Sequence, residues 1–335
     1  MRRRIALLFC LAGLGCRVEL GAPKGGEAPA GVGATVHVYS SMYKQVIDEV
    51  QPVLAAHLAK SAPGVQVEWF QAGSEKIATR LDTELAGGGS PCDLLLTSDP
   101  AYYARLKKDG RLVPYVSPAA LRQPRAFVDS SGAWATARVS TMVIGVGATI
   151  PDPPASFADL PRGKLHVAMG DPLSSGTSYT TVSVLSARYG WDFFRTLKSK
   201  GAIVAGGNSN VLQRLETGES DAGWVLLENL LAARAKGDKV GIVIPADGAV
   251  LVPGPIALMD HARHSEAARA VYDALLSEDV QRAIVAKGLM HSADPAIPPP
   301  PGAPTLDALL SKATPPSSQP SDEIKASFNA IFFKP

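Results

Sequence analysis

The sequence predicts an α/β fold with two lobes that are joined by two crossings of the chain. Strand-like and helix-like segments alternate from residue 35 onward, which is typical of a parallel or mixed sheet flanked by helices. Two extended passages, residues 134–148 and 240–259, bracket a second set of such units, so we expect each passage to run from one lobe to the other. The length of 335 residues, 46% of them apolar, is enough for two ordinary domains with a sizeable core.

The N-terminus has the pattern of an export signal. Three arginines precede a short apolar run at residues 5–14, which is typical of a signal peptide over residues 1–15 and too short to span a membrane. The ending Gly-Leu-Gly-Cys resembles a bacterial lipobox, so we expect lipidation at Cys16; ordinary cleavage nearby is the alternative. Residues 16–34 are rich in Gly, Ala and Pro and predict a flexible tether between a lipid anchor and a folded body.

Charge and cysteine content exclude several classes of function. Without residues 1–15, which carry three arginines and no acidic residue, the formal charge changes from +2 to −1. A nearly neutral chain lacks the basic surface of a nucleic-acid-binding protein. If Cys16 carries lipid and Cys10 is removed with the signal peptide, Cys92 stands alone, so neither a disulfide framework nor a cysteine metal site is expected.

The first lobe is predicted from three strand–helix units. Val, Trp, Phe and Leu concentrate in the strand segments, while apolar residues recur at helical spacing in the helix segments. Ser74 is the expected N-cap of the second helix, which glycines terminate. The expected strands are 35–39, 65–70 and 93–98, and the expected helices are 42–60, 74–89 and 99–110.

The second lobe follows the first crossing and repeats this organisation. Its expected strands are 164–170 and 202–207, its helices are 180–201 and 210–219, and residues 221–237 add a further unit. After the second crossing come a helix at 265–288, a Pro-rich stretch and a helical pattern at 321–333. We therefore expect residues 35–142 plus 246–335 to form lobe 1 and residues 143–245 to form lobe 2.

Catalysis has little support in the sequence. The phosphate-binding GxxxxGK[ST], the dinucleotide-binding GxGxxG, the zinc motif HExxH and the GxSxG elbow are all missing. A serine hydrolase would have to use Ser174 or Ser175 with His166 as base. Because His166 alternates with apolar neighbours on a predicted strand, a packing or surface role explains it better. We expect no enzyme activity and no cofactor.

Four loops carry the pattern of an anion site. Each follows a predicted strand, precedes a predicted helix and is rich in hydroxyl, amide or glycine residues, and helix N-termini offer unpaired N–H groups to anions. Any one of these residues could simply cap its helix, but four loops at the same edge of a sheet would face one cleft. The candidates are Ser40, Ser41, Gly73, Ser74, Ser174, Ser175, Gly176, Thr177, Tyr179, Asn208, Ser209 and Asn210.

Taken together, these segments resemble the extracytoplasmic solute-binding proteins of ABC importers, in the branch that includes ferric-ion, aminoethylphosphonate and sugar-phosphate receptors. The resemblance implies a two-lobed periplasmic-binding-protein fold that bends at a hinge, a location in the periplasm or cell envelope, a membrane permease as partner, a small ligand, a monomer and no catalysis. The matching stretches are VHVYSSMYKQV, VQVEWFQAGSEKIATRL, SPCDLLLTSDPAYYARLKKDGRL, MGDPLSSGTSY, LQRLETGESDAGWV and IPPPPGAPTLDALL with SDEIKASFNAIF.

The resemblance leaves the ligand open between an oxyanion and a ferric ion. Ferric receptors of this branch carry adjacent tyrosines in the segment resembling residues 221–231, where this chain has Leu227, Glu228 and Asn229. Tyr43 and Tyr179 are the alternative ferric ligands. We favour a phosphonate, a phosphate ester or an inorganic oxyanion, since a ferric ion prefers several hard oxygen donors.

Four further side chains complete the predicted site. Glu228 would pair with an amino or hydroxyl group of the ligand, or would be a solvated helix residue. Arg138, in the first crossing, would meet the anion or brace the hinge. Trp224 would line the cleft, with core packing as its alternative, and Ser98 ends the strand at 93–98. Molybdate-type receptors are a related possibility, because they too hold oxyanions with serines and backbone N–H groups.

Overall fold

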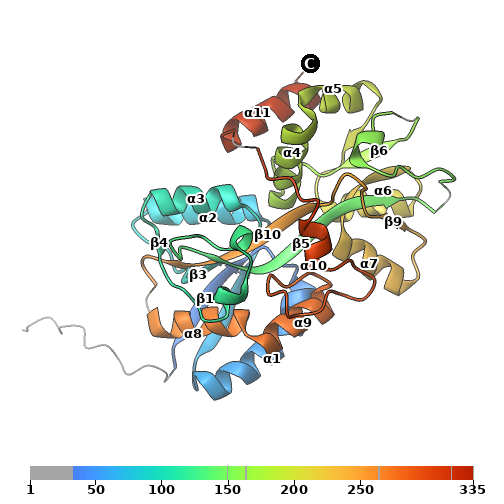
Figure 1. The fold of residues 1–335 in the computed structure, drawn as a ribbon. Coiled ribbons are helices and arrows are strands. Elements are labelled where there is room, and N and C mark those ends of the chain that lie inside the picture. Colours follow the sequence, from blue (N-terminus) through green and yellow to red (C-terminus); the bar gives the residue numbers. More distant parts are fainter. Residues whose placement is uncertain (1–32, 149, 163, 263–264, 318, 335) are drawn as a thin grey trace, which may run out of the picture. The chain divides into compact units, whose positions relative to one another are not determined.

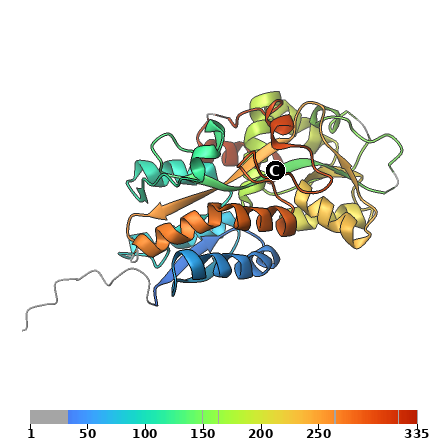
Figure 2. The same ribbon diagram turned by 60° about the horizontal axis from the view of Figure 1, so that its bottom comes forward.

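The computed structural model describes residues 33–148, 150–162, 164–262, 265–317 and 319–334. The predicted signal peptide, Cys16 and nearly all of the predicted tether lie outside the described residues. Ten strands of the described chain form one mixed sheet, whose central path runs β2-β1-β3-β10-β5-β8-β6-β7. The helices flank this sheet on both faces, as Figures 1 and 2 show.

The first half of the sheet is built from parallel strands that each lead into a helix. β1 pairs in parallel with both β2 and β3, so their carboxyl ends meet at one edge. The elements of this half are β1 (Thr35–Ser40), α1 (Lys44–Ser61), β2 (Gln66–Gln71), α2 (Ser74–Ala86), β3 (Leu94–Leu96), α3 (Pro100–Lys108), β4 (Leu112–Val113), α8 (Ser265–Leu276) and α9 (Glu278–Gly288).

The second half repeats the arrangement around another set of parallel strands. β6 pairs in parallel with β7 and β8, which again brings the strand ends and the following helices together. The elements are β6 (Val167–Met169), α4 (Gly176–Tyr189), α5 (Trp191–Ser199), β7 (Ile203–Val204), α6 (Asn208–Glu216), β8 (Ala222–Leu226), α7 (Leu227–Lys236), β9 (Gly241–Val243), α10 (Leu306–Leu310) and α11 (Ser321–Phe332).

Two long antiparallel strands join the halves. β5 (Ala135–Val146) and β10 (Val250–Met259) pair with each other, and β10 also pairs with β3 while β5 also pairs with β8. Figure 1 shows both strands running from one half of the sheet into the other. The two predicted crossings are therefore these strands, and every residue of β5 is buried.

Each half has an apolar core on both faces of its sheet. In the first half, α1, α8 and α9 cover one face and α2 and α3 the other. In the second half, α4 and α5 cover one face and α6 and α7 the other. Since both faces are buried, the strands are nearly continuous apolar runs, as in LLL of β3. The fold class is the predicted α/β class.

The C-terminal helix differs from the expectation that residues 246–335 all belong to lobe 1. α11 packs against α4 and α5, and its Ile324, Phe328 and Phe332 are buried in the core of the second half. The rings of Phe328 and Phe194 meet edge to face at 6.1 Å. The three residues stand four apart, so they form one apolar stripe, and burying each stabilises by about 1.5–3 kcal/mol. The stripe predicts a helix but does not say which lobe it covers.

Candidate functional site

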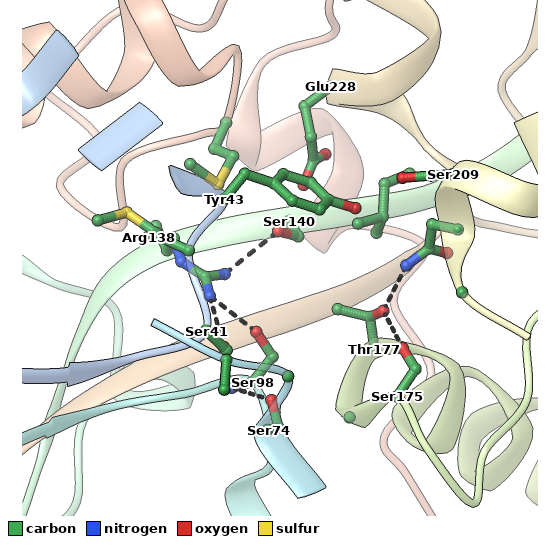
Figure 3. Close-up of a pocket in the computed structure, with 18 of the residues that line it drawn as sticks. Ser41, Tyr43, Ser74, Ser98, Arg138, Ser140, Ser175, Thr177, Ser209 and Glu228 are labelled. Atoms are coloured by element: carbon green, nitrogen blue, oxygen red, sulfur yellow. Dashed lines mark hydrogen bonds between the residues drawn. The ribbon is translucent and has the colours of Figure 1, made fainter. Parts of the chain in front are cut away.

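A cavity of about 240 Å³ lies where the carboxyl ends of the parallel strands from both halves converge. The strand–helix connections after β1, β2, β3, β6, β7 and β8 all contribute to its wall, together with two residues of β5. Figure 3 shows the polar side chains that surround it. Its lining residues are Ser41, Met42, Tyr43, Gln71, Ala72, Gly73, Ser74, Ser98, Arg138, Ser140, Ser174, Ser175, Gly176, Thr177, Gly207, Asn208, Ser209, Leu226, Glu228 and Met290.

Arg138 places a buried positive charge at this cavity. It lies on β5 with only 3% of its surface exposed. Its Nη2 donates to Ser41 Oγ at 3.1 Å and to Ser98 Oγ at 3.0 Å, and its Nη1 donates to Ser140 Oγ at 3.4 Å. Burial lowers the pKa of Arg138, but an arginine pKa begins above about 12, so the group stays charged.

No carboxylate neutralises this charge by direct pairing. Among the residues that the structure describes, Arg138 has no acidic oxygen within 4.0 Å, and its Nε has no hydrogen-bond partner. The serine hydroxyls that surround the guanidinium are neutral. Ser140 hydrogen bonds the Glu228 carboxylate, whereas Ser41 and Ser98 can still donate their protons to a ligand. Glu228 acts on this charge only from beyond 4.0 Å. A buried cation without a directly paired counter-charge is costly, so the cavity favours an anion.

Helix N-termini add further donors around the cavity. The N-cap residues of α1, α2, α6 and α7 are Tyr43, Gly73, Gly207 and Leu226, and none of these four residues caps its helix with its side chain. Their first backbone N–H groups therefore lack an N-cap acceptor and lie at the positive ends of the helix dipoles, although in α7 the Glu228 carboxylate accepts from its own backbone N–H.

The capping alternative holds for Ser175 alone. Its Oγ accepts from Ser178 N at 3.4 Å at the start of α4. Ser74 is not the predicted N-cap, because Gly73 holds that position, and Ser74 Oγ instead accepts from Ser98 N at 3.2 Å. Ser41 and Ser98 instead bond Arg138, and Thr177 bonds Asn208.

The wall from the second half is neutral and linked by hydrogen bonds. Thr177 Oγ1 accepts from Asn208 Nδ2 at 2.8 Å and lies 3.0 Å from Ser175 Oγ. Asn208 is buried and its Oδ1 has no partner. A Cβ on Gly176 would lie 2.8 Å from the carbonyl oxygen of Ser98, so glycine lets the N-terminus of α4 touch the opposite wall.

An acidic corner lies beside this wall. Glu228, in the first turn of α7, is 6% exposed, and burial raises the pKa of its carboxyl to about 7, although Ser140 and Arg138 act to lower it. Burial also raises the pKa of Tyr43, whose hydroxyl accepts from Asn229 Nδ2 at 3.5 Å. Glu228 can therefore donate a proton to a ligand below pH 7 and accept from one above it.

Most predicted site residues lie at this cavity, but four do not. Ser40 is fully buried, and its Oγ accepts from Met42 N at 3.1 Å within a turn. Asn210 is exposed and donates to the carbonyl oxygen of Ala205 at 2.9 Å. Trp224 is fully buried in the core of the second half, where it packs against Phe194.

Tyr179 is the fourth displaced residue, and its position removes the predicted ferric pair. It is buried in α4 in the core of the second half, with Lys325 Nζ 5.4 Å from its ring centroid. Burial raises its pKa to about 12, which disfavours a phenolate. Tyr43 lines the cavity and Tyr179 does not, so the structure does not bring the two together.

The hydrolase alternative also fails on geometry. His166 precedes β6, at the opposite end of that strand from Ser174 and Ser175. Its Nδ1 lies 3.1 Å from Asp221 Oδ2, and its side chain is largely exposed. No histidine is among the described residues that line the cavity.

Several lining residues were not predicted. Ser140 stands two residues after Arg138 on the same strand, so strand alternation could have identified it. Gln71 and Met42 flank predicted candidates, whereas Met290 follows α9 and carries no local signal. In the described part of the chain, no cluster of three His, Cys, Asp or Glu residues could hold a metal ion. None of its helices combines the length and the apolar character that a membrane crossing needs.

Comparison with solved structures shows the same fold in bacterial binding proteins. Iron-bound HitA from Pseudomonas aeruginosa is 20% identical with a TM-score of 0.75, covering 89% of this chain and 99% of that one. The substrate binding protein of the ABC transporter from Agrobacterium tumefaciens is 20% identical with a TM-score of 0.76, covering 92% and 96%. AfuA from Actinobacillus pleuropneumoniae, with fructose-6-phosphate bound, is 17% identical with a TM-score of 0.73, covering 90% and 97%.

These structural similarities confirm the predicted two-lobed α/β fold. No curated protein sequence matches the chain. The family model described as "Bacterial extracellular solute-binding protein" matches residues 35–290, which is more than half of the chain and includes every lining residue of the cavity. The chain therefore belongs to the bacterial extracellular solute-binding proteins.

Proposed function

We propose that this protein is the substrate-binding component of an ABC importer and that it captures a small oxyanion in the cavity around Arg138. Its partner is a membrane permease, and it works in the periplasm or cell envelope, held to the membrane by lipid on Cys16. The Agrobacterium relative is itself the substrate binding protein of an ABC transporter, and AfuA was solved with a phosphorylated sugar. Both similarities support this assignment.

The observation that carries the proposal is the unpaired charge of Arg138. Three serine hydroxyls hold the guanidinium in place, and none of them neutralises it. An oxyanion would supply the missing counter-charge and would accept hydrogen bonds from the serines and the helix N-termini.

The number of donors is sufficient for tight binding. Micromolar affinity requires about 8 kcal/mol, and a hydrogen bond to a charged group contributes roughly 1.5–3 kcal/mol. Four or five such bonds suffice after the losses of translational freedom and of lobe mobility. The Arg138, Ser41, Ser98, Thr177 and Ser209 side chains alone offer that number.

Size and charge narrow the ligand class. A volume of 240 Å³ holds about eight water molecules, which suits a phosphonate, a small phosphate ester or an inorganic oxyanion. Glu228 adds a group that can donate to the anion when protonated or accept from a ligand amine when ionised. Tyr43 is the only tyrosine among the described lining residues, so the cavity offers little to a ferric ion beyond Tyr43 and Glu228.

A thermal-shift screen tests the proposal. The probes are methylphosphonate, 2-aminoethylphosphonate, glycerol 3-phosphate, sulfate, molybdate and ferric citrate. A ligand at 100 times its Kd stabilises by about 2.7 kcal/mol, which raises the Tm of a chain of this size by several degrees. We expect at least one oxyanion to do so and to be recovered unchanged. Stabilisation by ferric citrate alone, or turnover of a phosphate ester, would contradict the proposal.

A further inference from the structure

The strand that carries Arg138 is irregular at that residue. Along β5 and β10, Gly254 pairs with Arg138 but the next residue, Pro255, pairs with Thr136, so Ala137 has no partner on β10. This is a β-bulge, a feature that re-aims neighbouring side chains and often lies beside functional sites. The one irregularity in this pair of strands thus falls next to the charged residue of the cavity.

Other elements bond the backbone on both sides of Arg138. The Ala137 carbonyl accepts from Gln281 Nε2 at 2.7 Å, and Gln281 comes from α9. Val139 exchanges two backbone bonds with His291, at 2.8 and 3.0 Å. Both neighbours of Arg138 are therefore fixed to the first half of the molecule, which satisfies buried backbone groups that would otherwise be costly.

Gly254 forms the surface on which the arginine side chain lies. A Cβ at Gly254 would lie 2.8 Å from Arg138 Cγ, 3.0 Å from its Nη1 and 3.1 Å from its Cζ. Two of these three atoms belong to the guanidinium itself, so a side chain at position 254 would need the space that the guanidinium occupies.

A buried tyrosine of α3 also holds the backbone at this bulge. Tyr103 is fully buried, and its hydroxyl donates to the carbonyl oxygen of Pro255 at 2.8 Å. The same hydroxyl accepts from Thr97 N at 2.9 Å, one residue before Ser98, whose Oγ accepts from Arg138. Tyr103 thus connects the bulge to the residue that holds the guanidinium.

From these contacts we infer that Gly254 is a positioning residue for anion recognition: its missing side chain sets where the Arg138 guanidinium lies, with the bulge at Ala137 and the Tyr103 hydroxyl fixing the backbone behind it. The predicted effect of Gly254 on ligand affinity rests on the proposed function, whereas its predicted effect on the position of the guanidinium does not. The bulge aims the arginine and the glycine limits how far it can retract from the cavity.

The test compares Gly254→Ala with Gly145→Ala. Gly145 lies on β5, the strand that carries Arg138, and a Cβ there would lie 2.7 Å from Leu215 Cδ1, so the control is equally crowded but does not touch Arg138. Isothermal titration with sulfate or methylphosphonate, whichever binds the wild type, should show at least a tenfold weaker Kd for Gly254→Ala, because a charge-assisted hydrogen bond is lost. Gly145→Ala should change the Kd less than twofold.

A double-mutant cycle separates positioning from general damage. In an Arg138→Met background, Gly254→Ala should produce no further loss of affinity, since its effect acts through the arginine. Equal losses from the two glycine variants, or additive losses in the cycle, would overturn the inference. If Gly254→Ala does not fold, Tyr103→Phe replaces it. We expect this variant to bind the anion about threefold more weakly, and unchanged binding would contradict the inference.

A structural measurement keeps this inference separate from the proposed function. If the wild type binds neither sulfate nor methylphosphonate, the proposed anion function fails, and crystal structures of the ligand-free wild type and Gly254→Ala still decide the inference. A guanidinium displaced from Ser41 and Ser98 in the variant would support positioning by Gly254. A guanidinium in the same place would overturn it.

Discussion

The two walls of the cavity differ in how their polar groups are held. On the first wall, the Arg138 guanidinium, fixed by the hydroxyls of Ser41 and Ser98, carries a formal charge and is almost fully buried. On the second wall, Thr177 and Asn208 are neutral, hydrogen bond to each other and come from the starts of α4 and α6.

Because of this difference, we expect the two walls to contribute to anion binding in different ways. A fixed charge supplies most of the attraction for an anion before the second wall moves toward the ligand, because preorganised groups lose little freedom on binding. Neutral donors at helix N-termini add directional hydrogen bonds once the second wall meets the ligand. We therefore expect substitutions on the first wall to reduce affinity more than substitutions on the second.

Removing the charge of the first wall should have the largest effect. Arg138→Met keeps most of the aliphatic stem but loses the hydrogen bonds to the ligand and the counter-charge. We expect the Kd for the bound oxyanion, measured by isothermal titration, to weaken about a thousandfold. The ligand-free protein should keep its Tm or gain stability, because an unpaired buried charge is removed.

The matched control is Arg122→Met. Arg122 pairs with Asp294 at 2.6 Å, and neither residue lines the cavity. Its loss should leave the Kd unchanged. A comparable weakening in both variants would mean that the effect of Arg138 is not local, and the contrast between the walls would fail.

Glu228 should make the next largest difference, through pH. Its folded pKa of about 7 lies above the ordinary 4.5, so the folded state holds a proton that the unfolded chain releases. Stability from this group is fully present below pH 4.5 and is lost as pH rises to 7, at about 1.4 kcal/mol per pH unit. Glu228→Gln should remove this slope in denaturant unfolding measured between pH 4.5 and 8.

The same carboxyl should separate the ligand classes. Sulfate keeps its charge in this range, so its affinity should fall, by up to tenfold per pH unit, as Glu228 ionises above pH 7. 2-Aminoethylphosphonate carries an amine that an ionised Glu228 would attract, so its affinity should hold or rise. In Glu228→Gln, the affinity of both ligands should depend less on pH. If the pH dependence of sulfate affinity is the same in this variant as in the wild type, the anion binds away from the carboxyl.

The second wall should show the smallest effect. Thr177→Val removes one hydroxyl and leaves Asn208 Nδ2 without its acceptor, so we expect roughly three- to tenfold weaker binding by titration. Tyr179→Phe, on the same helix but outside the cavity, is the control and should not alter the Kd. A loss for Thr177→Val as large as that for Arg138→Met would erase the difference between the walls.

The sequence could predict which loops form the site, because chain order and strand direction place them. Ser41, Gly73, Ser98 and Thr177 follow parallel strands or begin helices, and such positions gather at one edge of a sheet. The two long crossings were predictable from their length and apolar character. Arg138 was predictable as the one charged residue of the long strand β5.

Side-chain direction within those loops was not predictable. Ser40 and Ser41 are adjacent, but Ser40 turns inward to bond Met42 N while Ser41 reaches the guanidinium. Asn210 lies two residues after Asn208 in α6, which rotates it away from the cavity. Met290 and α11 depend on contacts between distant segments, which no local pattern encodes.

The proposed anion lies against Arg138, and the position of this anion can be measured directly. A crystal of the protein grown with molybdate would give an anomalous difference peak for the metal of the oxyanion. We predict one strong peak in the cavity, with its oxygens 2.7–3.2 Å from Arg138 nitrogens and from the hydroxyls of Ser41 or Ser98. A fully occupied peak elsewhere on the protein, with the cavity empty, would contradict the account.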